Sequence, residues 1–162
     1  MHSPGPLPLL DTLDTNQDVI HTELKDITHA ESLMLPSFNA NCLNWVVGHI
    51  LTSRDTCLSL LDLPGVLTSE QTAVYNYGSE RLTDPADALD FPLMLEKLDA
   101  SYAALQNRLK AVRADELEKT SNLWGRPEPI GGMLAFFFWH EAYHAGQLNL
   151  LRQVAGKNDK TI

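Results

Sequence analysis

The sequence predicts an all-α protein with a four-helix-bundle fold. Apolar residues recur at helical spacing over four segments, at about residues 7–26, 41–61, 90–112 and 131–155. No segment shows the alternation of apolar and polar residues that would indicate a half-buried strand. A chain of 162 residues and 18.0 kDa fits one hydrophobic core, so we expect a single domain over residues 1–162.

Local signals bound the first two helices. The first helix is predicted from one apolar face, formed by Leu13, Ile20, Leu24 and Ile27. Thr28 and Glu31 then have the spacing of a capping box, which predicts a short extra turn. The second helix is expected to end before Pro64 and Gly65. Its candidate N-caps are Ser37, Asn39 and Asn41.

The second half of the chain begins with residues 64–90, the longest irregular stretch. A loop of that length in a compact domain is functional or contains small structured turns. Asp90 and Pro92 are placed to start the third helix, and Gly156 is placed to end the fourth. Residues 115–118 are expected to add a turn between these helices.

The charge and the hydropathy of the chain exclude several partners. With 12 basic and 21 acidic residues, the net charge of −9 gives no electrostatic attraction for nucleic acid and repels anionic lipid. The longest apolar run, residues 133–139, is far shorter than the roughly 20 residues of a membrane-spanning helix. The N-terminal residues also lack the basic region of a secretory signal. We therefore expect a cytoplasmic protein that binds neither nucleic acid nor membrane.

Cys42 and Cys57 are the two cysteines of the chain. Both fall within the second predicted helix, in which the residues between them span about 22 Å. That distance exceeds the reach of a disulfide bond. The fold must therefore be stabilised by its core.

The fourth helix contains two histidines at positions i and i+4, His140 and His144. Residues at this spacing share a helical face, so both imidazoles can reach one metal ion. The apolar residues on the same face are Met133, Phe137, Leu148 and Leu151. The pair therefore points into the core, where a metal would bind the neutral nitrogens. The alternative is a pair of core histidines that hydrogen-bond to tyrosines or carbonyls.

His140, Glu141 and His144 also match the His-Glu-x-x-His motif of zinc proteases. In those enzymes Glu141 would be the general base, and a third ligand would follow downstream. Gln147 and Leu150 occupy the positions where one class carries Gly and His, and no Glu follows Glu141 for the other class. Because the protease sheet is also missing, we exclude a zincin protease. We expect Glu141 to be an exposed side chain or, alternatively, a support for the metal ligands.

A third ligand must come from upstream, where four histidines are candidates. His2 lies in the N-terminal tail, His21 at the edge of an apolar stripe, and His29 in a predicted turn. His49 remains, on the second helix beside Gly48, which lets a neighbouring helix or a ligand approach closely. On the residues alone, an ordinary core histidine stays the simpler interpretation of His49.

Two motifs carry a family resemblance. The first is Asn44-Trp45-x-x-Gly48-His49, and the second, about 90 residues later, is His140-x-x-x-His144-x-Gly146-Gln147-Leu148-x-x-Leu151-Arg152. Together with the order of helices and the long loop, they resemble the DinB/YfiT-like family of bacterial four-helix-bundle metal proteins. The resemblance implies that His49, His140 and His144 are the three ligands of one divalent metal. It also implies that the chain forms a homodimer.

The expected function follows from such a site. Three neutral imidazoles would leave at least one coordination position open for water or substrate, as in catalytic sites. All-imidazole ligation suits zinc, nickel, iron or copper. The family that the chain resembles also includes enzymes that use low-molecular-weight thiols. We therefore expect a hydrolase or a small-thiol S-transferase that acts on a small molecule. The alternative is a non-catalytic stress protein that binds a metal or a small molecule.

Four loop residues are candidates for covering the site: Tyr75, Tyr77, Trp124 and Arg126. Aromatic rings and an arginine would suit an acidic small molecule. The alternative is that these side chains only pack the loops onto the bundle.

Overall fold

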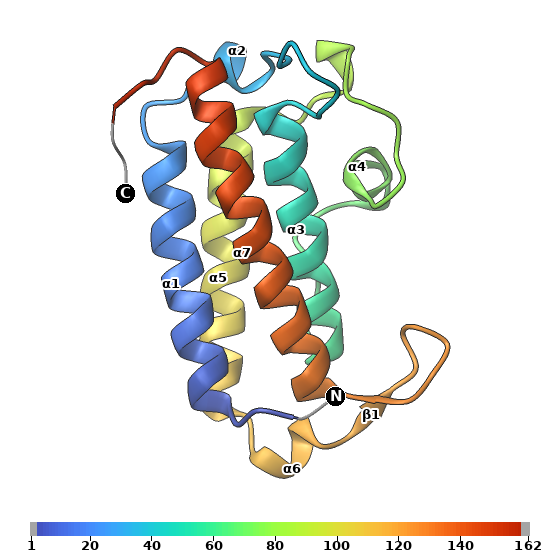
Figure 1. Cartoon of the computed structure of the whole chain (residues 1–162). Helices are drawn as coiled ribbons and strands as arrows, with labels where there is room; N and C mark the ends of the chain where they lie inside the picture. The colour runs from blue at the N-terminus through green and yellow to red at the C-terminus, as the bar shows by residue number, and fades with distance from the viewer. Residues whose placement is uncertain (1–2, 160–162) are drawn as a thin grey trace.

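The computed structural model describes residues 3–159 of the chain. Four long helices lie side by side (Figure 1): α1 (Pro6–Leu24), α3 (Leu43–Leu60), α5 (Phe91–Ala111) and α7 (Ile130–Val154). Helix accounts for 64% of the structure. The predicted all-α four-helix bundle is confirmed, with helix ends within two residues of the predicted ones.

Shorter elements connect the long helices. They are α2 (His29–Ser32), α4 (Ser69–Tyr75), the 3₁₀ helix η1 (Pro85–Asp87), α6 (Ala114–Leu117), β1 (Thr120–Ser121) and β2 (Glu128–Pro129). The two strands form an antiparallel ladder in which Thr120 lies opposite Pro129. The sequence predicted no strand, because a two-residue strand is too short to show alternation. Within residues 3–159, no helix is long and apolar enough to cross a membrane.

The helix ends agree with the sequence in part. The capping box between Thr28 and Glu31 is present and opens α2. Gly156 adopts a positive φ of 81° directly after the C-cap of α7, as a helix-ending glycine does. The predicted N-caps Ser37, Asn39 and Asn41 were wrong. Residues 37–39 form a bend, and Cys42, with extended backbone angles, is itself the N-cap of α3 without a side-chain cap bond. Asp90 precedes α5 and also makes no such bond.

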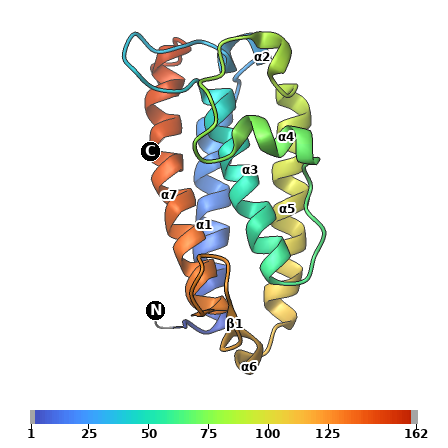
Figure 2. The same ribbon diagram turned by 90° about the vertical axis from the view of Figure 1, so that its right-hand side faces the viewer.

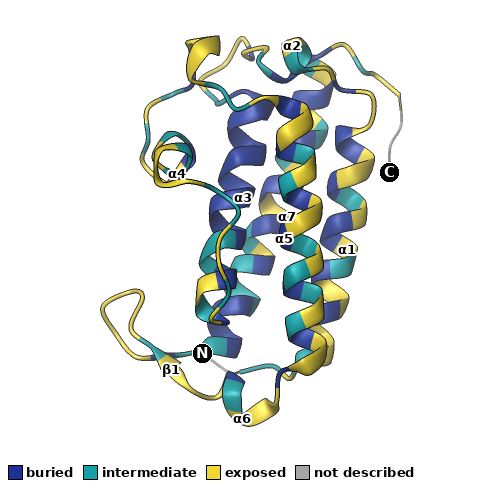
Figure 3. Ribbon diagram, turned by 180° about the vertical axis from the view of Figure 1, so that it is seen from behind, coloured by how far each residue is buried: buried dark blue, intermediate teal, exposed yellow. Residues whose placement is uncertain are grey.

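Each long helix packs against two others, α1 and α3 both contacting α5 and α7 (Figure 2). Their inward faces are buried, and the outer face of α5 is largely exposed (Figure 3). The core divides into two clusters along the bundle. One cluster includes Ile20, Leu51, Leu98 and Ala145, and the other includes Leu13, Cys57, Leu105 and Phe138.

A layer of buried polar side chains lies between the two core clusters along each long helix. It contains one residue or pair from each helix: Asn16 and Gln17, Arg54, Ser101, and Glu141. Asn16 donates from Nδ2 to the backbone carbonyl of Phe138 at 2.8 Å, which joins α1 to α7. Since buried polar groups need partners, this layer restricts how the four helices can slide against one another.

The loop between α3 and α5 is anchored to α3 through Tyr75, the last residue of α4. The Tyr75 hydroxyl donates to Asn44 Oδ1 at 2.9 Å and accepts from the Leu89 backbone N–H at 2.6 Å. Its ring packs directly on Gly48, where an added Cβ would lie 2.2 Å from Tyr75 Cδ1. Gly48 therefore admits a close neighbour, as predicted, and that neighbour is the Tyr75 ring.

We expect Gly48→Ala to destabilise the protein by at least about 2 kcal/mol, because the methyl group collides with a buried aromatic ring. Gly146→Ala is the matched control on α7, since nothing lies within 4 Å of its added Cβ. There the alanine should stabilise the helix by about 0.5–1 kcal/mol. Urea unfolding measures both, and a similar gain in both variants would contradict the packing described here.

Candidate metal centre

Three histidines meet in the groove between α3 and α7. His49 comes from α3, and His140 and His144 lie one turn apart on α7. One ring nitrogen from each lies within 4.8 Å of the others. The ring centroids are 4.4 Å apart for His140 and His144, 4.8 Å for His49 and His144, and 5.1 Å for His49 and His140. The structure thus brings together the trio that the sequence proposed, and metal binding by it stays a prediction.

The other histidines that the structure describes lie elsewhere. His21 Nε2 is 2.8 Å from Asp99 Oδ1 on the side of α1. His29 accepts from the backbone N–H of Phe91 at 3.2 Å. His2 lies outside the described residues. Among the described histidines upstream of α7, His49 is therefore the one that lies beside His140 and His144.

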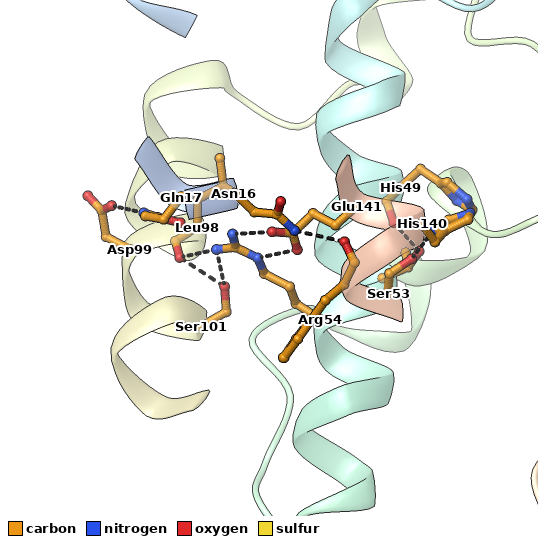
Figure 4. Close-up of polar contacts among 12 residues, drawn as sticks. Asn16, Gln17, His49, Ser53, Arg54, Leu98, Asp99, Ser101, His140 and Glu141 are labelled. Atoms are coloured by element: carbon orange, nitrogen blue, oxygen red, sulfur yellow. Dashed lines mark hydrogen bonds and ion pairs between the residues drawn. The ribbon is translucent and has the colours of Figure 1, made fainter. Parts of the chain in front are cut away.

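Each histidine of the trio is oriented by a partner on its Nδ1 atom. His49 Nδ1 lies 2.8 Å from the Tyr75 carbonyl, and His144 Nδ1 lies 2.8 Å from Gln147 Oε1. Because these partners only accept, both Nδ1 atoms carry the proton, and the two Nε2 atoms keep their lone pairs. His140 Nδ1 lies 3.4 Å from Ser53 Oγ, as Figure 4 shows.

The Nε2 atoms form a site that fits a metal ion. His140 Nε2 and His144 Nε2 are 3.0 Å apart. Two nitrogens bound to one tetrahedral zinc ion at ordinary distances lie about 3.3 Å apart, so this pair needs little movement. A His49 ring nitrogen lies within 4.8 Å of the pair and would move closer on binding. A hydrogen bond from each ligand's other ring nitrogen is also typical of metal-binding histidines.

The surroundings keep the imidazoles neutral. Burial lowers the pKa of His49 and of His140. The pKa of His144 is lowered to about 4, first by burial and then by the neighbouring His140 and His49. The Trp45 ring stacks on His49 at 4.9 Å and contributes to this burial. Neutral rings are the form that binds a metal.

Glu141 lies at the centre of the bundle, so its predicted exposure was wrong. Only 1% of its side chain is exposed. Arg54 donates from Nε to Glu141 Oε2 at 2.8 Å and from Nη2 to Glu141 Oε1 at 2.9 Å. His140 is half-buried at the groove, and the next residue on the helix therefore turns towards the bundle axis.

The Arg54–Glu141 pair fixes α3 against α7 directly behind the histidines. Arg54 Nη1 also donates to the Leu98 carbonyl at 2.9 Å and contacts Ser101 Oγ at 3.4 Å, which adds α5 (Figure 4). Ser53 and Arg54 are neighbours on α3, as His140 and Glu141 are on α7. On each helix, one residue of the neighbouring pair faces the groove, and the other belongs to the buried ion pair.

Two cavities flank the three histidines. The first, called the aromatic cavity, has a volume of about 400 Å³. It is lined by His49, Thr52, Ser53, Thr56, Asn76, Tyr77, Trp124, Phe136, Phe137 and His140. The second, called the loop cavity, has a volume of about 320 Å³. It is lined by residues 38–41, Trp45, Val46, His144, Gln147, Leu150 and Leu151. The trio therefore has access to both.

The four loop candidates behave differently. Tyr77 and Trp124 line the aromatic cavity, in agreement with a covering role. Tyr75 is buried against Gly48 and contacts His49 through its carbonyl, so its side chain only packs the loop. Arg126 pairs with Glu128 at 2.9 Å and lines neither cavity. The expected recognition of an acidic molecule by this arginine is therefore unsupported.

Several contributors to the site were missed from the sequence. Gln147, three residues after His144, could have been found from helical spacing. Ser53 and the Tyr75 carbonyl depend on contacts across the bundle, which local spacing does not reveal. The cysteines are free and buried, and burial raises the pKa of both thiols. They are therefore poor nucleophiles.

Similarity to known proteins extends over most of the chain. The sequence model of the DinB superfamily matches residues 12–148. A search of curated proteins gave no match. Among solved structures, the crystal structure of a conserved protein from Enterococcus faecalis aligns with a TM-score of 0.70 at 19% identity, covering 91% of this chain and 95% of that chain. At this identity the likeness shows a shared fold.

We expect Glu141→Gln to cost about 3–5 kcal/mol of unfolding free energy, because it leaves the Arg54 charge buried without its counter-charge. The double variant Arg54→Met/Glu141→Leu should recover most of this loss, since it removes both charges together. Asp115→Asn, which breaks the exposed pair with Arg113, is the control and should leave the urea midpoint unchanged. A double variant no more stable than Glu141→Gln would contradict the role assigned to the Arg54–Glu141 pair.

The metal-free protein should lose stability as the pH falls from 6.5 to 4. In this window an unfolded imidazole binds a proton, whereas folded His144 stays neutral until about pH 4. Because the unfolded state binds more protons, His144 alone accounts for about 3 kcal/mol of the loss. Urea unfolding at several pH values should show a flatter dependence for His144→Gln. A slope in His144→Gln equal to that of the wild type would refute the assignment.

Proposed function

The chain belongs to the DinB superfamily, and we propose that His49, His140 and His144 bind one divalent transition metal in an enzyme that acts on a small molecule. The observation that carries the proposal is the convergence of three ring nitrogens within 4.8 Å in a groove that opens to two cavities. Two of the three rings are held by acceptors that leave Nε2 unprotonated.

The three imidazole ligands narrow the choice of metal. Imidazole nitrogens suit zinc, nickel or iron, and the absence of a carboxylate from the trio disfavours magnesium and calcium. When bound, such an ion lowers the pKa of a water or thiol and polarises a substrate oxygen. The protein's own residues then supply orientation: the Tyr75 carbonyl, Ser53 and Gln147 hold the three rings.

The two cavities favour a reaction between two reactants. His49 and His140 face the aromatic cavity, and His144 faces the loop cavity. A nucleophile and its acceptor can therefore approach the trio from different sides, as the transfer of a small thiol requires. Hydrolysis would need one of the two cavities for its substrate. A thiol S-transferase is thus our first reaction class and a hydrolase the second.

We expect His49→Ala, His140→Ala and His144→Ala each to lower the bound metal, measured by elemental analysis, from about one equivalent to less than a tenth of that. Their circular dichroism should stay helical, because the core buries enough surface without the metal. His21→Ala and His29→Ala are matched controls and should keep the wild-type metal content. Equal metal in His49→Ala and wild type would remove His49 from the site.

Turnover separates the enzyme from a binding protein. The metal-loaded and the metal-stripped protein are assayed on esters, amides and pairs of a thiol with an electrophile. Activity that depends on both the metal and His144 supports the proposal. Full metal binding without turnover on this panel would favour a non-catalytic metal-binding protein instead.

A further inference from the structure

One wall of the aromatic cavity is built from three stacked or edge-on rings. Trp124 lies 5.0 Å from Phe136 at an angle of 81°, and Phe136 lies 5.5 Å from Phe137 at 78°. The His140 ring stacks on Phe136 at 6.1 Å and 21°. The wall therefore offers faces and edges to a flat ring, and it runs directly into one of the three histidines.

Another part of the lining is a stripe of hydroxyl groups on α3. Residues 49, 52, 53 and 56 share one helical face. Thr52 donates its hydroxyl hydrogen to the His49 carbonyl at 2.8 Å, and Thr56 donates to the Thr52 carbonyl at 3.1 Å. Because both hydrogens are used within the helix, the two oxygens present lone pairs to the cavity. A ligand that binds this wall must supply the hydrogen-bond donors.

Apart from His49 and His140, whose pKa values are lowered by burial, no lining residue of the aromatic cavity is acidic or basic, although the chain has 33 charged residues among its 162. Arg54 and Glu141, which follow Ser53 and His140 in the sequence, are paired with each other. Arg126 is paired with Glu128. In the metal-free protein, a charged ligand would therefore lose its hydration without gaining a counter-charge, which opposes its binding.

From these walls we infer that the aromatic cavity binds a neutral aromatic molecule that carries an N–H or O–H donor. Its ring packs against Trp124, Phe136 and Phe137, and its donor reaches the oxygens of Thr52 and Thr56. The volume of about 400 Å³ lies in the range of small-molecule sites. The inference rests on the proposed function, and it names the substrate class for this side of the trio.

Three probes of similar size test the inference: benzamide, benzoate and benzylammonium. Each carries one benzene ring. Benzamide is neutral and has N–H donors, benzoate is anionic, and benzylammonium is cationic. Calorimetric titration of the metal-loaded and the metal-stripped protein at pH 7.5 measures each dissociation constant. The stripped protein shows recognition by the cavity alone, because a carboxylate can also bind a metal directly. We expect benzamide to bind at least tenfold more tightly than either charged probe to the stripped protein, and to bind the loaded protein as well.

Two variants locate the binding. Phe136→Leu removes a ring from the aromatic wall, and Thr56→Val removes one acceptor at constant volume. Each should weaken benzamide at least fivefold. The controls are Phe38→Leu, an exposed aromatic that lines the loop cavity and not the aromatic cavity, and Thr12→Val, which has the same hydroxyl-to-carbonyl bond on α1 at 2.8 Å. Both controls should bind benzamide as the wild type does.

The inference is overturned if benzoate or benzylammonium matches benzamide in the stripped protein, or if benzamide is not bound. Elemental analysis of the same samples keeps this apart from the metal proposal. A protein with one equivalent of metal and no benzamide binding retains the metal site and loses the inference. A protein that holds no metal yet prefers benzamide retains the inference and loses the proposed function.

Discussion

The buried ion pair between Arg54 and Glu141 is the contact on which the geometry of the three histidines depends. It joins α3 to α7, the two helices that carry His49, His140 and His144. A bidentate ion pair forms only in a narrow range of geometries. Loss of one partner destabilises the protein strongly, whereas the intact pair is no more stabilising than an apolar pair of similar volume. Its main effect is therefore to select one register between the two helices. A shift of α7 by one residue would separate the charges and would also move the imidazoles away from His49.

The polar layer extends this restriction to the whole bundle. Arg54 reaches the Leu98 carbonyl and Ser101 on α5, and Asn16 on α1 reaches the Phe138 carbonyl on α7. Above and below the layer, the contacts are apolar and could tolerate small displacements, since hydrophobic burial is non-directional. Hydrogen bonds between buried groups are directional, and leaving one unmade is costly. The apolar clusters thus supply stability, and the layer between them specifies the arrangement.

The sequence predicted the four helices well because helical periodicity is a local property, and it predicted α2 because a capping box spans only four residues. It failed where the answer depended on distant residues. Apolar residues surround much of α7, including the run at residues 133–139, so hydrophobicity could not decide which side faces the axis. Glu141 faces inward because Arg54 lies there, 87 positions away in the chain. Tyr75 is buried for a similar reason, since Gly48 leaves room for its ring.

The division of labour between helices and loops bears on how such a site can change its substrate. The three histidines lie on rigid helices, and the Arg54–Glu141 pair behind them is buried. The aromatic cavity, in contrast, takes Tyr77 and Trp124 from the connecting segments, and the loop cavity takes residues 38–41 from the connection before α3. Substitutions in these segments can reshape either cavity without disturbing the polar layer, because loops tolerate change better than packed helices. The wall formed by Thr52, Ser53 and Thr56 is different, since Ser53 precedes Arg54 and contacts His140. Specificity that arises from this wall is therefore tied to the register of α3, whereas specificity that arises from Tyr77 and Trp124 is free to vary.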